Sequence, residues 1–369
     1  MLIQKIRLKN FRCFDDQTFD FENNKFVIIT GKNGSGKSSL LEALHYSCYL
    51  RSFRTHLNKD LVNLEQDYFF INIEFDLENL GTSDQLHVGF SDAEGKQVKL
   101  NQKIIQSYKE LISQYRIVSL SEDDLRVVSG APETRREFFD FALFLLTPDF
   151  LVQSKRYRQT LEQRNSMLGN MHARNSSSFN EELKIWSQKL WEEALPIKEA
   201  RKDYLIELEL LVNKLLMQYF SEQETDLCVS FTYSSKNSPG ETFELFWEQH
   251  ESKSLITELK WGRSLFGAHL DDFSISFQNK KAKIFASRGQ QKLIVFLIKV
   301  AQLSMTLQHG EPGVFLLDDF LTDFDAGRLQ NCLTVLQDLP FQIFITSPVD
   351  PQVFLMSPVL LGLSKTISL

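Results

Sequence analysis

The spacing of hydrophobic residues predicts strands in the first third of the chain. Apolar and polar positions alternate over Ile3–Leu8, and a period of two is typical of a half-buried strand. The continuous apolar run Phe26–Thr30 predicts a buried strand, and Ser38–Tyr49 after it has helical periodicity. Four more strands are expected, at Phe19–Phe21, Phe70–Phe75, Leu86–Phe90 and Arg116–Leu120.

Helices dominate the expected structure in the middle of the chain. Helical periodicity covers four segments, Thr134–Leu146, Phe150–Leu168, Asn180–Phe220 and Thr242–Lys260. Pro196 is expected to bend or break the third of these helices, because proline has no amide hydrogen to donate. A single strand, Leu227–Tyr233, is expected before the fourth.

The last part of the chain returns to a mixture of strands and helices. A hairpin is expected, followed by a helix, a buried strand, a second helix and a second buried strand. The expected ranges are Phe273–Phe277 with Ala282–Ala286, then Gln290–Leu307, Val314–Leu317, Ala326–Gln337 and Phe341–Thr346. The pattern predicts an α/β domain that is split in two, with a mostly helical domain inserted between its halves. The predicted segments are residues 1–120, 121–266 and 267–369.

Composition narrows the class of protein. A chain of 369 residues can form two or three domains, and a hydrophobic fraction of 43% excludes wholesale disorder. The net charge of −7 argues against a surface that is basic throughout, so any DNA contact is expected to use a local patch. No apolar run suits a transmembrane helix or a signal peptide, so a cytoplasmic location without membrane association is expected. The spacing of the four cysteines fits neither a zinc motif nor a disulfide framework.

The strongest motif is Gly31-Lys32-Asn33-Gly34-Ser35-Gly36-Lys37-Ser38, which matches the P-loop pattern G-x-x-x-x-G-K-[ST]. It lies between a predicted buried strand and a predicted helix, which is the context that a P-loop requires. Its glycines let backbone amides converge on phosphates, and the helix N-terminus favours negative charge. Lys37 is expected to contact the β- and γ-phosphates of ATP, and Ser38 to coordinate Mg²⁺. The expected nucleotide contacts are Gly31, Asn33, Gly34, Ser35, Gly36, Lys37, Ser38 and Ser39.

A second motif follows the buried strand Val314–Leu317. The acids Asp318 and Asp319 end this strand, as in a Walker B motif. Asp318 is expected to help hold Mg²⁺, and Asp319 to activate the water that attacks the γ-phosphate. The alternative is that these acids only cap the next helix, which is common after strands.

A third motif, Ser287-Arg288-Gly289-Gln290-Gln291, precedes an apolar helix about thirty residues before the Walker B acids. ABC-type ATPases carry their signature motif at this position, where a helix N-terminus contacts the γ-phosphate of an ATP held by the other subunit. Ser287, Gly289 and Gln290 are therefore expected to complete the nucleotide site of a second copy. A P-loop and a Walker B motif separated by a whole domain resemble the split layout of SMC and Rad50 ATPases. Thr322-Asp323-Phe324-Asp325 has D-loop spacing, and Thr346-Ser347 ends the next strand, where these ATPases have a γ-phosphate sensor.

Several further segments, taken with these motifs, resemble the RecF family of bacterial recombination and DNA-repair ATPases. They include Leu8-Lys9-Asn10-Phe11-Arg12, Leu41-Glu42-Ala43, Arg51-Ser52-Phe53-Arg54, Asp124–Pro132 and Gly267-Ala268-His269-Leu270-Asp271-Asp272. The resemblance implies an ATP-dependent homodimer that clamps gapped or junction DNA and releases it after slow, DNA-stimulated hydrolysis. It also implies cooperation with RecO and RecR, loading of RecA, and roles in recombinational repair, replication restart and the SOS response.

Candidate DNA contacts are basic residues in three segments, and each is weighed against an ordinary solvated surface. They are Arg51 and Arg54, Arg135 and Arg136, and Lys155, Arg156, Arg158 and Arg164. Phosphate contacts would dominate such binding. Two other functions stay open, an SMC- or Rad50-like chromosome-maintenance ATPase and a nucleotide-switched clamp with negligible hydrolysis. The short helical insert argues against a long coiled-coil arm.

Overall fold

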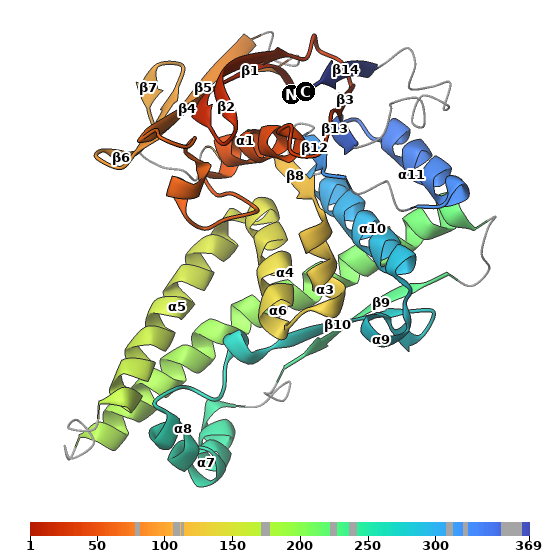
Figure 1. Ribbon diagram of the computed structural model, residues 1–369. Coiled ribbons are helices and arrows are strands. Elements are labelled where there is room, and N and C mark those ends of the chain that lie inside the picture. Colours follow the sequence, from red (N-terminus) through yellow and green to blue (C-terminus); the bar gives the residue numbers. More distant parts are fainter. Residues whose placement is uncertain are drawn as a thin grey trace. The chain divides into compact units, whose positions relative to one another are not determined.

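The structure is a computed structural model of the whole chain (Figure 1). It describes residues 1–77, 82–105, 111, 114–170, 178–221, 227–235, 242–307, 313–319, 324–347 and 364–369. Within these ranges, no helix has the length and apolar character needed to cross a membrane. The chain forms two compact units, each of which is built from separate stretches of sequence. Unit 1 comprises residues 1–125, 215–226 and 288–369, and unit 2 comprises residues 126–214 and 227–287.

Unit 1 contains two sheets of different kinds. The larger sheet is antiparallel, and its strand order is β2 (Phe14–Asp20), β1 (Leu2–Phe11), β4 (Tyr68–Leu77), β5 (Thr82–Ser91), β6 (Gly95–Leu100) and β7 (Lys103–Ile104). The other sheet is parallel, in the order β14 (Ser364–Ser368), β3 (Phe26–Thr30), β13 (Gln342–Ser347), β12 (Val314–Leu317) and β8 (Ile117–Leu120). The first two-thirds of unit 1 thus joins its last third through the pairing of β3 with β13.

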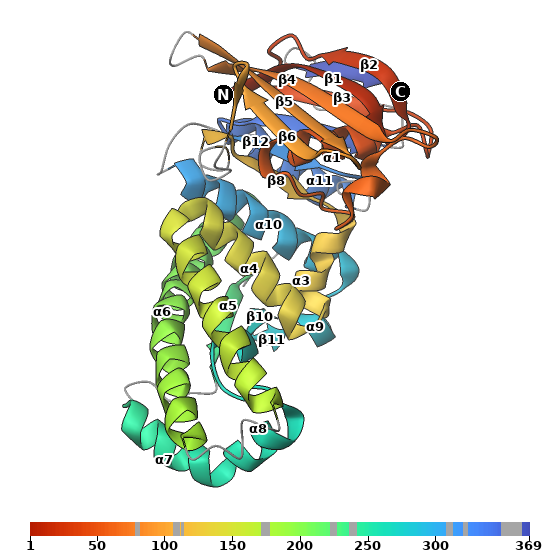
Figure 2. The ribbon, with the colours of Figure 1, turned by 90° about the vertical axis from the view of Figure 1, so that its left-hand side faces the viewer.

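Helix α1 (Lys37–Tyr49) lies between these two sheets (Figures 1 and 2). Every residue from Leu40 to Tyr49 is buried, because the helix is covered on all sides. Glu42, His45 and Ser47 are the polar residues in this buried stretch. Over the described residues, unit 1 also contains η1 (Asn58–Leu61), η2 (Glu122–Leu125), α10 (Arg288–Leu307) and α11 (Ala326–Asp338). The position of α1 fixes the loop that precedes it.

Unit 2 is mostly helical and has its own core. Its helices are α3 (Arg126–Ser129), α4 (Pro132–Leu146), α5 (Pro148–Gly169), α6 (Phe179–Phe220), α7 (Phe243–Lys253), α8 (Leu255–Trp261), η4 (Ala268–Leu270) and α9 (Ala282–Phe285). A small antiparallel sheet has the order β11 (Lys280–Lys281), β10 (Asp272–Phe277) and β9 (Val229–Ser234). Phe139 of α4 is buried against the rings of Phe231 and Phe273 on this sheet. The last turns of α6, from Leu215, belong to unit 1.

Most predicted elements are confirmed, and the main differences concern four places in the chain. Helix α6 runs through Pro196 without a break, so the break is excluded, while the alternative of a bend stays a prediction. The predicted helix Thr242–Lys260 is two helices that meet at Ser254. The predicted strand Ala282–Ala286 is the short helix α9, because β11 contributes only two residues to the hairpin. Strand β14 was not predicted.

The compact units divide the chain at different residues from the three predicted segments. The sequence placed Gly267 at the start of the last segment, whereas the division between the units falls after Ser287. The reason is that β10 pairs along its whole length with β9, so residues 267–287 pack within unit 2.

Candidate functional site

The P-loop connects β3 to α1 in unit 1. Gly34 and Gly36 have φ values of 85° and 106°, which glycine adopts far more readily than other residues. A Cβ atom at Gly36 would also lie only 2.7 Å from Cys13 Sγ. Lys37 is buried, and its ammonium donates hydrogen bonds to the carbonyls of Gly31 at 2.9 Å and Lys32 at 3.1 Å. The loop therefore holds a cation beside a helix N-terminus, which is an arrangement suited to phosphate.

The two Walker B acids lie at the same edge of the parallel sheet as the P-loop. Since β13 separates β3 from β12, the carboxyl ends of these three strands meet there. Ser38 Oγ donates a hydrogen bond to Asp318 Oδ1 at 2.9 Å, across 280 positions of sequence. Asp319 follows with a φ of 48°, a left-handed conformation that aspartate tolerates better than most residues.

Thr346, at the end of β13, links both acids. Its Oγ1 atom accepts a hydrogen bond from the backbone amide of Asp319 at 2.8 Å and lies 2.9 Å from Asp318 Oδ1. The side chain is buried. The sequence had suggested this residue only as a γ-phosphate sensor. The structure places its hydroxyl between the two strands that carry the phosphate-binding loop and the acids.

The pKa of Asp318 is raised above its ordinary value by burial, although the hydrogen bonds from Ser38 and Thr346 partly offset this effect. A half-buried carboxylate beside a hydroxyl suits a hard cation such as Mg²⁺, which prefers oxygen ligands and takes the rest of its shell from phosphates and water. Over the described ranges, no cluster of three or more histidine, cysteine or acidic residues could hold a metal by itself.

A pocket of about 760 Å³ opens in front of the P-loop. It is lined by Arg12, Cys13, Asn33, Gly34, Gly36, Lys37, Ser38, Ser39, Arg54, Asp60, Val62, Asn63, Leu64 and Asp319. Most of the predicted nucleotide contacts of the first half-site are thus brought together. Two arginines that were not predicted as nucleotide contacts, Arg12 and Arg54, also face this pocket.

Glu42 holds both arginines. Its carboxylate is fully buried on α1 and accepts two hydrogen bonds from Arg12, at 2.7 and 2.8 Å. Arg54 Nη1 lies 3.6 Å from the same carboxylate, and Ser52 Oγ donates to it at 2.5 Å. The sequence treated Arg54 as a DNA contact and Arg12 and Glu42 only as marks of a family resemblance. A lone acid in an apolar helix was the available signal, because a buried carboxylate requires a partner.

The predicted signature residues lie at the start of α10. Ser287 is exposed and directly precedes the helix, and Gly289 and Gln290 are half-buried in its first turn. Arg288 and Lys292 form ion pairs with Glu122, and Lys299 pairs with Asp124 at 2.9 Å. The carboxylates of η2 thereby anchor the helix that carries the motif. In the predicted D-loop, Thr322 and Asp323 lie outside the described residues, and Asp325 caps α11 by accepting from the amide of Arg328.

The candidate DNA contacts differ widely in exposure. Arg135 is almost completely buried, pairs with both oxygens of Asp272 and donates to the carbonyl of Gly130. Arg136 donates to the carbonyl of Asp271. These bonds favour structural roles for Arg135 and Arg136.

The remaining basic candidates for DNA contacts also include both buried and exposed residues. Arg164 is fully buried, so it is not available to a large ligand. Arg51, Lys155, Arg156 and Arg158 are exposed.

The fold and the site define the class of protein, which is a split P-loop ATPase of the ABC type. The family described as AAA domain matches residues 5–227. The solved structure of an Smc head bound to the C-terminal winged-helix domain of ScpA has the same fold, with a TM-score of 0.55, 14% identity and coverage of 96% of this chain and 91% of that one. The predicted fold class is therefore confirmed.

The family follows from closer relatives. A protein of Chloroherpeton thalassium named DNA replication and repair protein RecF is 30% identical over 355 residues, which are 94% of this chain and 95% of the relative. The protein of the same name from Bacillus cytotoxicus is 28% identical over 95% of this chain and 93% of its own. A solved structure described as the recombination mediator protein RecF-ATP in the RecFOR pathway superimposes with a TM-score of 0.82 and 25% identity, covering 95% of this chain and 92% of that one. This chain belongs to the RecF family of DNA replication and repair proteins.

Proposed function

We propose that unit 1 binds ATP with Mg²⁺ in the pocket in front of the P-loop. The observation that carries this proposal is the hydrogen bond between Ser38 and Asp318, which joins the P-loop to the Walker B acid. In this proposal Lys37 exchanges its two carbonyl partners for the β- and γ-phosphates, which offer it charged acceptors. Ser38 and Asp318 provide oxygen ligands for the cation. Asp319 orients the attacking water.

ATP then joins two copies of the chain. The proposed partner for the γ-phosphate of one copy is the helix N-terminus at Ser287, Gly289 and Gln290 of the other copy. Exposure of Ser287 supports this arrangement, because a contact made in trans requires an accessible side chain. The ion pairs of Glu122 with Arg288 and Lys292 support it further, since they hold the first turn of α10 in place.

The closed homodimer is proposed to clamp duplex DNA and junctions of duplex with single strands, and hydrolysis is proposed to release it. Membership of the RecF family supports cooperation with RecO and RecR in loading RecA, in the cytoplasm. Of the exposed basic candidates, Arg51, Lys155 and Arg158 are proposed for phosphate contacts. Arg54 and Arg156, which are also exposed, form ion pairs with Glu42 and Glu193. A clamp that binds ATP without hydrolysing it is distinguished by one measurement. DNA-stimulated release of phosphate that Asp319→Asn abolishes indicates an enzyme.

Sedimentation velocity with and without ATP and Mg²⁺ tests the central arrangement. The native chain is expected to double in mass with ATP. Ser287→Arg is expected to bind ATP and remain a monomer, because the added side chain blocks the contact in trans. Lys37→Ala is expected to lose ATP binding itself. Doubling by Ser287→Arg would contradict the trans contact, and unchanged ATP binding by Lys37→Ala would contradict the site.

A further inference from the structure

The solvent-exposed face of the antiparallel sheet in unit 1 carries an ordered arrangement of side chains that the ATP site does not use. Lys9 of β1 lies directly across from Phe70 of β4, Phe70 from Gly89 of β5, and Gly89 from Gln97 of β6. Side chains at paired positions point to the same face of a sheet. A cation, an aromatic ring, a gap without a side chain and an amide therefore follow one another across four strands.

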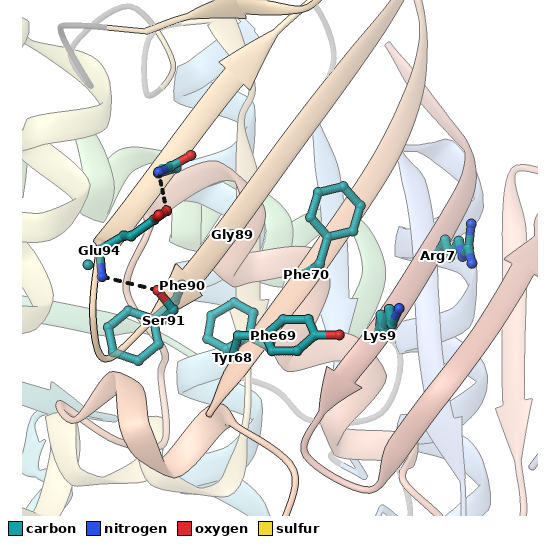
Figure 3. A pocket seen from close by; sticks show the side chains of 11 residues that line it. Arg7, Lys9, Tyr68, Phe69, Phe70, Gly89, Phe90, Ser91 and Glu94 are labelled. Carbon is teal, nitrogen blue, oxygen red and sulfur yellow. Dashed lines mark hydrogen bonds between the residues drawn. The ribbon is translucent and has the colours of Figure 1, made fainter. Parts of the chain in front are cut away.

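A pocket of about 510 Å³ occupies this part of the face. Figure 3 shows Tyr68 and Phe70 on the middle strand, between Arg7 and Lys9 on one side and Gly89 and Ser91 on the other. Gly89 has no side chain, and it therefore leaves a hollow in the face. A Cβ atom at this position would have room, because its nearest neighbours would be the carbonyl of Phe69 at 3.9 Å and the Phe70 ring at 4.0 Å. Aromatic rings thus border a space that is open from the solvent.

Cations line one side of this pocket. Lys5, Arg7 and Lys9 alternate with buried residues along β1, so all three reach the same exposed face at regular intervals. The Lys9 ammonium lies 6.0 Å from the centre of the Tyr68 ring. Carboxylates reduce the positive charge of this face. Asp20 of β2 and Glu74 of β4 lie directly across from Lys5. Asp16 binds the Arg7 guanidinium through both of its oxygens, and Glu94 accepts from the Gln97 amide at 2.7 Å.

We infer that this face binds single-stranded DNA. Unpaired bases stack on Tyr68 and Phe70 and enter the hollow at Gly89, while the backbone phosphates follow the cations of β1. Stacking on exposed aromatic side chains of a sheet is a general mode of single-strand recognition. Duplex DNA fits this face less well, because its bases are already stacked and because Asp16 and Glu94 repel its dense negative charge. The inference rests on the proposed role in DNA transactions and assigns the unpaired strand to a surface separate from the ATP pocket.

Two variants probe the site without removing a buried side chain. Gly89→Val fills the hollow with a residue that suits a strand, and Lys9→Ala removes the central cation. Each has a matched control on the same sheet. Gln85→Val adds the same side chain farther along β5, and Lys103→Ala removes an exposed cation from β7.

The measurement is fluorescence anisotropy of a labelled 15-nucleotide oligothymidylate, in the absence of ATP. Gly89→Val is expected to weaken binding about tenfold, the effect of losing one stacked base. Lys9→Ala is expected to weaken binding and to lower the slope of log affinity against log salt concentration by about 0.7, the contribution of one phosphate contact in single-stranded DNA. Both controls are expected to bind within about twofold of the native chain. Equal binding by Gly89→Val and the native chain would overturn the inference, as would equal losses in Gly89→Val and Gln85→Val.

Sedimentation of the same proteins separates this inference from the proposed function. ATP-dependent doubling that persists in Gly89→Val while oligonucleotide binding is lost supports the inference. A native chain that doubles with ATP but does not bind the oligonucleotide overturns the inference and leaves the proposed function standing. Loss of doubling in Gly89→Val would assign the face to a second copy of the chain and would also overturn it.

Discussion

In each unit, an arginine donates two hydrogen bonds to the carboxylate of a fully buried glutamate, but the two pairs have different surroundings. In unit 1, Arg12 binds Glu42 while 22% of the arginine side chain stays exposed at the edge of the nucleotide pocket. In unit 2, Arg164 binds Glu258 with neither side chain exposed. The same chemical pair therefore faces a ligand site in one unit and only protein in the other.

The partners of each arginine explain the difference. Arg164 donates further hydrogen bonds to Ser187 and Ser264, and its guanidinium lies over the Phe266 ring at 4.6 Å. All three guanidinium nitrogens of Arg164 thus donate hydrogen bonds that join segments of unit 2. Arg12 instead donates one bond to the carbonyl of Asp60 and otherwise lies against the pocket. Burial of both partners indicates a role in stability, whereas partial exposure of the arginine indicates a role in binding.

The largest effect is expected from Arg164→Met, which breaks the fully buried pair. Removing Arg164 leaves Glu258 buried with only His250 and the Leu265 amide as partners. Breaking a buried ion pair costs about 3–5 kcal/mol of unfolding free energy, and these two partners place the expected loss toward the lower end of that range. All four tryptophans lie in unit 2, so their fluorescence during urea denaturation reports on this unit. Nucleotide affinity, which reports on unit 1, is expected to stay within about twofold. An unchanged unfolding midpoint would remove the distinction between the two pairs.

A smaller effect, of a different kind, is expected from Glu42→Gln. The amide can accept only one of the two bonds from Arg12, and its NH2 group repels the guanidinium, so the arginine leaves its place at the pocket. ATP affinity measured by calorimetry is expected to fall about tenfold, or about 1.4 kcal/mol. The tryptophan unfolding transition of unit 2 is expected to remain unchanged.

Arg12→Ala provides the matched test of this positioning role. If Glu42 acts through Arg12, the double variant that combines Arg12→Ala with Glu42→Gln is expected to bind ATP as weakly as Arg12→Ala alone. In that case Glu42→Gln has no further interaction to remove. Additive losses would show that Glu42 acts on the P-loop by another route.

Acidification is expected to act in opposite directions on Glu258 of unit 2 and Asp318 of unit 1. Burial raises the pKa of Glu258, but hydrogen bonds from His250 and Arg164 outweigh it, so the pKa lies below its ordinary value. Its stabilising contribution is therefore complete above the ordinary pKa of about 4.3 and is lost as the pH falls below it. The pKa of Asp318 in unit 1 is raised, mainly by burial, so protonation relieves a cost there.

Urea denaturation at pH 6 and pH 4, followed by tryptophan fluorescence, measures the effect in unit 2. The unfolding free energy is expected to fall at pH 4 by less than the loss caused by Arg164→Met. This fall is expected to shrink in Glu258→Gln, which has no carboxylate to protonate. An equal fall in that variant would assign the acid sensitivity to other groups.

The fold was predictable where local pattern and burial agree. Strands Phe26–Thr30 and Val314–Leu317 match the structure at both ends, because an uninterrupted apolar run can only be buried. The pattern failed at Ala282–Ala286, where four apolar residues suit a strand but β11 is too short to continue the hairpin. It also failed for β14, whose sequence Ser364–Ser368 alternates weakly and is a strand because it pairs with β3.

The site was predictable where its residues are contiguous in sequence. The P-loop is contiguous, so its sequence carries nearly all of its geometry. Arg12 and Glu42 are thirty positions apart, and only the packing of α1 between two sheets brings them together at the pocket. Charge alone also could not distinguish Arg156 from Arg164 on α5, since their exposure depends on what covers each face of that helix.

Arg156 extends the comparison to a third degree of exposure. Its guanidinium binds Glu193 at 2.9 Å, but 71% of the arginine side chain is exposed, so water already solvates most of the charge that the pair would neutralise. Arg156→Ala is expected to lower the unfolding free energy of unit 2 by about 0.5 kcal/mol, and 1 M salt is expected to abolish that difference. Arg164→Met in the same salt is expected to keep its full loss, because ions do not reach a fully buried pair. A loss for Arg156→Ala as large as that for Arg164→Met would show that geometry rather than exposure sets the strength of these pairs.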